Sequence, residues 1–229
     1  QLFFGRTGLV EKLQDFVKTQ PLTVLLGASG SGKSSLVKAG LIPQLRQETT
    51  EQWCILPPIR PGEAPLKATQ LPEVAAQNPQ QNLAQSIDVW AQNHPNSQLL
   101  LFVDQSEEII TLCQNEDERK EFFHQILQAI NVHRDKLRVV LSLRSDFEPQ
   151  VRAVSLKCFP TDDRGGTAEQ KIDWQSVQFI VPAMTRGELR EAIEKPAETR
   201  VMYFQPYELV EQLIDEVADM PGALPLLSF

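Results

Sequence analysis

A glycine-rich string of eight residues constrains this chain more than any other feature. It matches the pattern G-x-x-x-x-G-K-[ST], and its members are Gly27, Ala28, Ser29, Gly30, Ser31, Gly32, Lys33 and Ser34. The apolar run 22–26 before it is typical of a buried strand, and residues 35–41 after it are typical of a helix that begins there. In that context the string predicts a phosphate-binding loop rather than a chance glycine turn.

The residue types of this loop suit a phosphate. Glycines let the backbone curl so that several N–H groups point at one anion, and the N-terminus of the following helix adds partial positive charge. We expect Lys33 to reach the β- and γ-phosphates of a nucleotide and the Ser34 hydroxyl to ligate Mg²⁺. Ser35, the next residue, is included in the predicted nucleotide-binding segment.

Charge, hydrophobicity and cysteine content limit the partners and the cellular compartment that we expect for this chain. The formal net charge of −8 argues against broad, sequence-independent nucleic-acid binding, which needs a basic surface. No apolar run approaches the ~20 residues needed to span a bilayer, and the chain shows no basic-plus-apolar leader. Cys54, Cys113 and Cys158 are few and far apart, which indicates reduced thiols. We therefore predict a cytoplasmic protein that does not associate with membranes.

The order of apolar segments predicts the topology. Strand-like and helix-like segments alternate, which favours right-handed βαβ units and a parallel sheet. One additional strand, over residues 53–59, falls between the strand before the loop and the strand at 98–104. Pro57 and Pro58 cannot donate to a ladder, so this strand belongs at an edge. We predict an α/β fold of the additional-strand P-loop type with sheet order 5-1-4-3-2.

After Pro182 the pattern becomes helical throughout. Thr185 and Glu188 form a capping-box pair, and Pro196 is expected to end the helix that they begin. Pro206 suits the first turn of the next helix. We predict an α/β domain over residues 1–182 and the start of a helical domain over residues 183–229, in a chain that is part of a longer protein.

An acidic segment follows the strand at 98–104. The strand ends in Asp104, which is placed to help hold Mg²⁺ with Ser34. Glu107 and Glu108 come next, and either could orient or deprotonate a water that attacks a phosphate. The alternative is a solvated acidic turn that caps the helix at Ile109.

Arg144 ends the strand at 137–143. In the predicted sheet order this strand lies between the loop strand and the Asp104 strand, so its end faces the terminal phosphate. An arginine there can contact phosphate through two N–H groups. The alternative is an ion pair with Asp146 or Glu148.

Several segments, taken in order, resemble those of one family. They are FGR at 4–6, the loop with its following helix, IRPGEAPL, VDQSEEI, LSLRSDF, VPAMTRGELREAIEKPAE and GALPLL. The chain resembles the STAND-class NTPases (signal-transduction ATPases with numerous domains), and within them the novel-STAND subgroup, over nearly its whole length. Such modules are commonly found upstream of WD-repeat propellers in bacterial multidomain proteins.

The resemblance implies further roles. Phe4, Gly5 and Arg6 would lie near the adenine and ribose, Arg144 would be a sensor arginine, and Pro225 would belong to a motif that closes over bound nucleotide. From the residues alone, Phe4 could be an N-terminal staple and Pro225 a helix-start proline. The family usually has an aromatic residue where this chain has Ser106, a departure that bears on hydrolysis rather than on binding.

These expectations combine into an ATP- and ADP-binding switch with slow, Mg²⁺-dependent hydrolysis. Its further partners would be other proteins, or copies of itself, reached through flanking domains. A small-molecule P-loop kinase is one rival, although the chain shows no clear arginine-rich lid. A nucleotide-binding scaffold without turnover is another. A GTPase is the least supported, because no NKxD string occurs.

Overall fold

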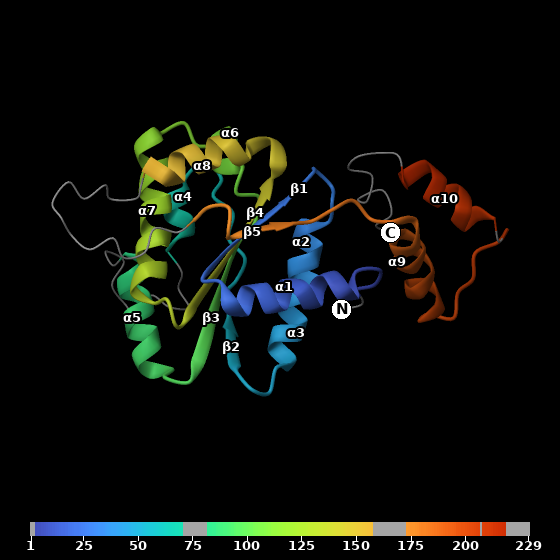
Figure 1. Ribbon diagram of the computed structural model, residues 1–229, viewed down its shortest axis with the longest axis horizontal. Coiled ribbons are helices and arrows are strands. Elements are labelled where there is room, and N and C mark those ends of the chain that lie inside the picture. Colours follow the sequence, from blue (N-terminus) through green and yellow to red (C-terminus); the bar gives the residue numbers. More distant parts are fainter. Residues whose placement is uncertain (1–2, 71–81, 158–172, 207, 219–229) are drawn as a thin grey trace.

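The computed structural model describes residues 3–70, 82–157, 173–206 and 208–218 (Figure 1). Within these ranges the strands form one five-stranded sheet in the order β2-β3-β4-β1-β5, and every pairing is parallel. The strands are β1 (Leu22–Gly27), β2 (Gln52–Ile55), β3 (Ser97–Val103), β4 (Leu137–Arg144) and β5 (Gln178–Ile180). This arrangement confirms the predicted order 5-1-4-3-2.

Helices cover both faces of the sheet, so the sheet is the middle of three layers (Figure 1). The helical elements before β5 are α1 (Thr7–Thr19), α2 (Lys33–Ser35), the π-helical segment η1 (Leu36–Leu41), α3 (Ile42–Gln47), α4 (Pro65–Ala68), α5 (Leu83–Asn93), α6 (Glu108–Thr111), α7 (Glu116–Val132), the 3₁₀ turn η2 (Ser145–Phe147) and α8 (Glu148–Lys157). The elements α4 to α8 pack on one face, and α1 to α3 pack on the other.

The two faces of the sheet follow from the period of two along each strand. In β3, Leu99, Leu101 and Val103 enter the core beneath α5 and α7, while Leu100 and Phe102 enter the core beneath α1 and η1. Because both faces are apolar, the central strands read as continuous hydrophobic runs, as expected for a buried parallel sheet.

The sheet register brings the ends of three strands together. Gly27, the last residue of β1, is opposite Arg144, the last residue of β4. Val103, the last residue of β3, is opposite Leu141. The carboxyl edge of a parallel α/β sheet is where ligands bind in this architecture, and here it carries the glycine-rich loop, the acidic segment and the arginine.

The edge strand is shorter than predicted. β2 ends at Ile55, and Ile59 returns only as an isolated bridge to Val103. The physical reason is that Pro57 and Pro58 have no N–H to give to the ladder. Its position at the edge, beside β3, is as predicted.

Beyond β5 the described chain is helical, with α9 (Arg186–Glu198) and α10 (Leu209–Ala218) packed on each other through a small apolar cluster of their own. The Thr185–Glu188 capping box is present, as predicted. The prediction that Pro196 ends α9 is wrong, because the helix continues to Glu198. A proline in the last turn removes one backbone donor without forcing the chain out of helical dihedrals.

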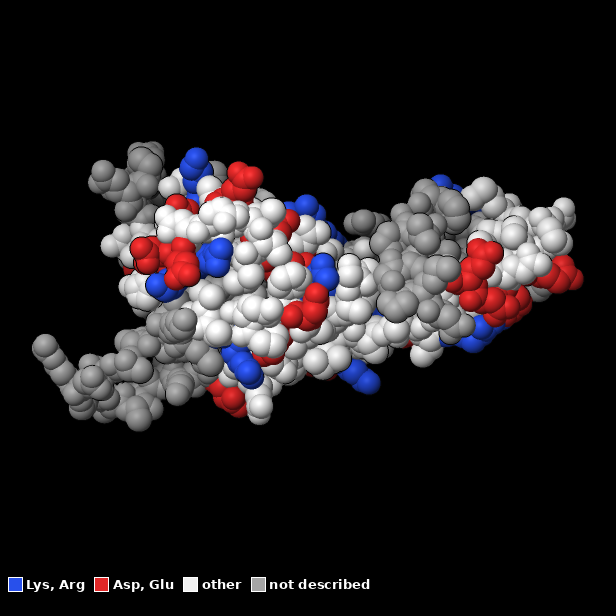
Figure 2. All heavy atoms as spheres, turned by 90° about the horizontal axis from the view of Figure 1, so that it is seen from above, with Lys and Arg blue, Asp and Glu red and all other residues white. Residues whose placement is uncertain are grey.

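Charge is distributed unevenly between the two parts of the chain. Viewed from above, acidic side chains gather over α9 and α10, while both signs mix over the α/β part (Figure 2). Among the described helices, none is both long and apolar enough to cross a membrane.

Candidate functional site

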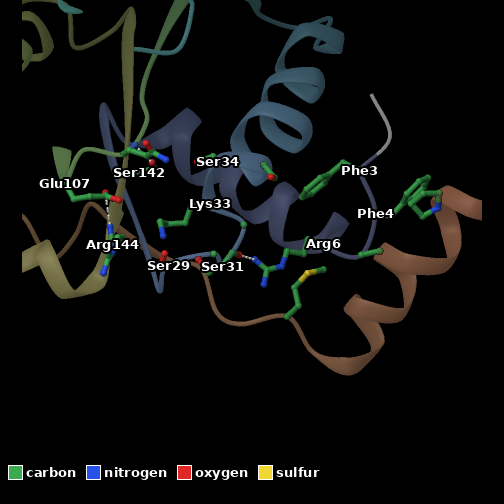
Figure 3. A pocket seen from close by; sticks show the side chains of 17 residues that line it. Phe3, Phe4, Arg6, Ser29, Ser31, Lys33, Ser34, Glu107, Ser142 and Arg144 are labelled. Atoms are coloured by element: carbon green, nitrogen blue, oxygen red, sulfur yellow. Dashed lines mark hydrogen bonds between the residues drawn. The ribbon is translucent and has the colours of Figure 1, made fainter. Parts of the chain in front are cut away.

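A hollow of about 700 Å³ opens at the carboxyl edge of the sheet (Figure 3). Its walls come from the N-terminal segment, the glycine-rich loop, the ends of β3 and β4, and the start of the helical part. They consist of Phe3, Phe4, Arg6, Ser29, Gly30, Ser31, Gly32, Lys33, Ser34, Ser35, Gln105, Glu107, Ser142, Arg144, Met184, Ala192 and Pro196. One end is charged and the other, with Phe3 and Phe4, is apolar.

Most of the residues singled out in the sequence line this hollow, but some do not. Gly5, Gly27, Ala28, Asp104 and Glu108 lie beside it without forming its wall. Pro225 lies outside the described residues.

The glycine-rich loop is curled around its own lysine. Lys33 Nζ donates to the carbonyl oxygens of Gly27, over 2.9 Å, and Ala28, over 2.8 Å. Gly30 and Gly32 have φ values of 68° and 84°, which only glycine adopts readily. Burial lowers the pKa of Lys33, and the nearby Glu107 carboxylate partly offsets this effect. The hydrogen-bond partners of the Lys33 side chain in this hollow are therefore two neutral carbonyls.

Asp104 is fully buried and both of its carboxylate oxygens have partners. Oδ1 accepts from Ser34 Oγ at 2.6 Å and from Ser142 Oγ at 2.8 Å. Oδ2 accepts from Lys38 Nζ at 2.6 Å, with an Arg60 nitrogen at 3.9 Å. Burial acts to raise the pKa of Asp104, but the hydrogen bonds from Lys38, Ser34 and Ser142 outweigh it and hold that pKa below its usual value. Asp104 is thus an anion.

The Ser34–Asp104 contact fits a magnesium site of the kind completed by a substrate. Mg²⁺ prefers oxygen ligands and usually binds through one or two protein groups together with substrate phosphates and water. A hydroxyl and a carboxylate 2.6 Å apart supply such a pair. Among the described residues there is no cluster of three or more His, Cys, Asp or Glu that would hold a metal without a substrate.

The two consecutive glutamates point to different places. Glu107 lines the hollow, and its Oε2 accepts from the Arg144 backbone N–H at 3.3 Å. Glu108 is turned away, and its Oε2 accepts from the Gly62 backbone N–H at 3.1 Å. The acidic-turn alternative describes Glu108 better than Glu107, since Glu108 begins helix α6.

Arg144 makes the ion pair with Asp146 that one interpretation of its sequence position expected, and it also lines the hollow. Its guanidinium lines the hollow, and it also makes a two-point contact with Asp146, with N···O distances of 3.1 and 2.6 Å. Its hydrogen bonds lower the pKa of Asp146. The ring of Phe147 lies 5.0 Å from the guanidinium carbon. A phosphate that binds here would meet an arginine already oriented by a carboxylate and an aromatic ring.

Arg6 connects three parts of the chain. Only 3% exposed, it donates to the Ser31 carbonyl of the loop at 2.9 Å and to the Pro182 carbonyl at 2.6 Å (Figure 3). Gly5 has a φ of 86°, and a Cβ there would come within 2.4 Å of the Glu188 carbonyl oxygen. These residues therefore fasten the N-terminal segment to the loop and to α9. The resemblance implied, in addition, a position near the adenine and ribose.

Six lining residues were not identified from the sequence: Phe3, Gln105, Ser142, Met184, Ala192 and Pro196. Three of them lie within the VPAMTRGELREAIEKPAE segment, where the sequence indicated a helix and a resemblance but no site residue. Ser106, the departure from the family pattern, is 1% exposed, and its backbone N–H donates to the Ser142 carbonyl at 2.8 Å. It packs behind the site.

The sheet order, the curled loop and the Ser34–Asp104 pair define a P-loop NTPase. The family model for novel STAND NTPase 1 matches residues 1–229. The chain therefore belongs to the novel STAND NTPase 1 family, which confirms that part of the sequence-based resemblance. A search of curated proteins returned no match.

Solved structures of low sequence identity share the fold. A Walker-type ATPase of Pyrococcus abyssi aligns with a TM-score of 0.60 at 17% identity over 97% of this chain. The Aeropyrum pernix ORC1 protein in complex with DNA gives 0.59 at 13% over 99%, and the ORC2 protein of the same organism, in ADPNP–ADP complexes, gives 0.56 at 15% over 84%. The present chain spans 65%, 58% and 51% of those three chains, respectively.

Proposed function

We propose that this chain binds ATP and ADP and hydrolyses ATP slowly with Mg²⁺. The observation that carries the proposal is the position of Lys33, held by carbonyl oxygens inside a curled loop and next to the Ser34–Asp104 pair. A phosphate in the loop would replace neutral carbonyls with an anionic partner for the ammonium, which is a stronger hydrogen bond.

The two ends of the hollow suit the two ends of a nucleotide. Loop N–H groups, Lys33 and Arg144 would hold the phosphates. Phe3, Phe4 and Met184 would pack against the base at the apolar end. The structurally similar ORC2 protein is known in ADPNP–ADP complexes, which supports nucleotide binding by this fold. Mg²⁺ would be held by Ser34 and Asp104, and it would neutralise charge on the β- and γ-phosphates.

Glu107 is the candidate general base of the hydrolysis. It would accept a proton from water while the water oxygen bonds to the γ-phosphorus and the bond to the bridging oxygen breaks, which leaves ADP and inorganic phosphate. Arg144 would stabilise charge on the terminal phosphate. Glu108 would position the Gly62 turn rather than touch the reacting atoms.

We propose further that the site acts as a switch in a larger cytoplasmic, multidomain protein, of the WD-repeat type that the resemblance implies. The predicted domain boundary lies at residue 182, the residue whose carbonyl Arg6 contacts, and Met184, Ala192 and Pro196 would belong to the helical side. Nucleotide would therefore touch both domains, and ATP and ADP would favour different placements of the helical part. A few kcal/mol of differential contact is enough to invert such a population.

Two rival functions make different demands on the site. A kinase requires an acceptor beside the terminal phosphate and gives little turnover without one. A passive scaffold requires affinity without turnover. A kinase would use Glu107 to accept the proton of the acceptor hydroxyl, whereas a passive scaffold would leave Glu107 without a chemical task.

The decisive experiment compares the wild-type chain with Lys33→Met. Calorimetry should give a loss in ADP and ATP affinity of roughly 10- to 100-fold, because a charge-assisted hydrogen bond contributes about 1.5–3 kcal/mol. Lys195→Met, at an exposed ion pair on α9, is the matched control. Unchanged nucleotide affinity in Lys33→Met would refute the proposed site. A second measurement, phosphate release with ATP as the only substrate, separates a hydrolase from both rivals, because neither rival releases phosphate under that condition.

A further inference from the structure

Gln105 has the most unusual backbone at the site. Its φ is 56°, in the left-handed region that a non-glycine residue adopts rarely and at a cost. Such conformations persist where the surroundings enforce them, and they cluster at functional sites. Gln105 lies between Asp104 and Ser106 and lines the hollow.

Hydrogen bonds on both sides enforce this conformation. The Gln105 backbone N–H donates to Ser142 Oγ at 2.9 Å, and the Gln105 carbonyl accepts from the Glu108 N–H at 2.9 Å. Ser142 is 1% exposed. Its hydroxyl has one hydrogen, which it donates to Asp104 Oδ1, and its lone pair receives the Gln105 N–H. One side chain on β4 therefore orients two consecutive residues after β3.

The Gln105 side chain is left available to a ligand. It is half-buried, and among the residues that the structure describes its amide has no hydrogen-bond partner. An amide can accept from a water O–H and donate to a phosphate oxygen at the same time, and it stays neutral throughout. Glutamine orients the attacking water in this manner in other phosphoryl-transfer sites.

We infer that Gln105 is a further catalytic residue, whose amide contacts the terminal phosphoryl group and its attacking water, and that Ser142 is the positioning residue that aims it. This inference rests on the proposed function. Glu107 still takes the proton, and Gln105 exchanges none. The amide therefore recognises what distinguishes ATP from ADP.

The test compares two substitutions at one position. Gln105→Ala removes the amide and keeps an unfavourable φ, whereas Gln105→Gly removes the amide and relieves it. Both should lower kcat by about 10²-fold, as loss of one aligned transition-state contact does. Both should keep wild-type ADP affinity and lose preference for a non-hydrolysable ATP analogue over ADP. In thermal unfolding, Gln105→Gly should have a higher melting temperature than Gln105→Ala. A loss of kcat that both variants share is therefore not caused by lower stability.

The role of Ser142 is tested by a double-mutant cycle. Ser142→Ala should lower kcat in the wild-type background and should cost less in the Gln105→Gly background, because only the Ser142 support of Asp104 is then left to lose. Ser86→Ala removes a hydroxyl that is also buried but lies in α5, and it should leave kcat unchanged. Equal losses in both backgrounds would overturn the positioning role.

Failure of the inference differs from failure of the proposed function. If the wild type binds neither nucleotide, both are wrong. If it binds both, and the Gln105 variants keep kcat and the ATP-analogue preference, only the inference is wrong. If the wild type binds both nucleotides but does not hydrolyse ATP, the inference is tested by binding alone: the Gln105 variants should then lose the preference for the ATP analogue over ADP.

Discussion

The backbone N–H of Gly62 donates a hydrogen bond to the carboxylate of Glu108 over 3.1 Å. This contact joins the turn after the edge strand to the helix after β3. It turns one of two adjacent acids away from the hollow and leaves Glu107 as the carboxylate that lines it. Glu107 and Glu108 are equal candidates in the sequence, but in the structure only Glu107 of the two lines the hollow.

Glutamine substitutions should separate the two acids. Glu107→Gln should lower ATP turnover by about 10²-fold or more while ATP affinity is kept, because an amide preserves shape but cannot take the proton. Glu108→Gln should stay within a few-fold of the wild-type rate. Steady-state phosphate release and calorimetry measure both quantities. Equal rates for both variants and the wild type would return Glu107 to the role of a solvated turn residue.

Arg6→Met should reduce stability and nucleotide affinity together. It removes the donors to Ser31 and Pro182, and such losses to a charged donor cost about 1.5–3 kcal/mol. Because the loop would lose its support, ADP and ATP affinity should fall by a similar factor. Chemical unfolding and calorimetry test this expectation, with the exposed Arg186→Met as control. Weaker binding at unchanged stability would instead support direct contact of Arg6 with the nucleotide.

Ser34→Ala should remove most of the effect of Mg²⁺ on ATP binding. Mg²⁺ should tighten ATP binding to the wild type, since Ser34 and Asp104 supply adjacent oxygen ligands. The substitution should leave metal-free ADP affinity nearly unchanged. Titrations with and without Mg²⁺ give the comparison. The same strengthening by Mg²⁺ in Ser34→Ala and in the wild type would place the metal elsewhere.

Nucleotide should protect α9 from hydrogen exchange. Ala192 and Pro196 line the hollow, so a bound base would cover the helix and slow its local opening. Helix α7, on the other side of the sheet, provides the internal control. Identical exchange in α9 with and without saturating ADP would disprove the coupling.

Two substitutions test the same contact. Ala192→Phe should fill the apolar end of the hollow and weaken binding of both nucleotides. Pro225→Ala should reduce the protection of α9 from exchange if Pro225 closes over the site.

Local patterns predicted the fold well because the controlling signals are local. An apolar strand, a glycine-rich loop and a helix start identify the first βα unit. One extra strand with two prolines is enough to place β2 at the edge. Asp104, just after β3, and Arg144, at the end of β4, could be placed at one edge because parallel strands end at the same edge of a sheet.

The orientation of individual side chains could not be predicted, because it depends on distant partners. Glu108 is turned by a residue 46 positions away in the chain, and Arg6 is held by residues 25 and 176 positions away. The left-handed backbone of Gln105 depends on a hydroxyl on another strand. No periodicity or motif in a single sequence encodes such pairings.

The contact between Arg6 and Pro182 affects when, during synthesis and folding, the nucleotide site becomes complete. The loop at 27–34 is complete early in synthesis, but one of its supports is a guanidinium whose second partner is a carbonyl 176 residues further along. A nascent chain that has not yet produced β5 lacks that anchor. Contacts of such sequence separation form late in folding, because the intervening chain must be closed first. Nucleotide binding should therefore report completion of the whole sheet, so that a cell has few half-made copies sequestering ATP.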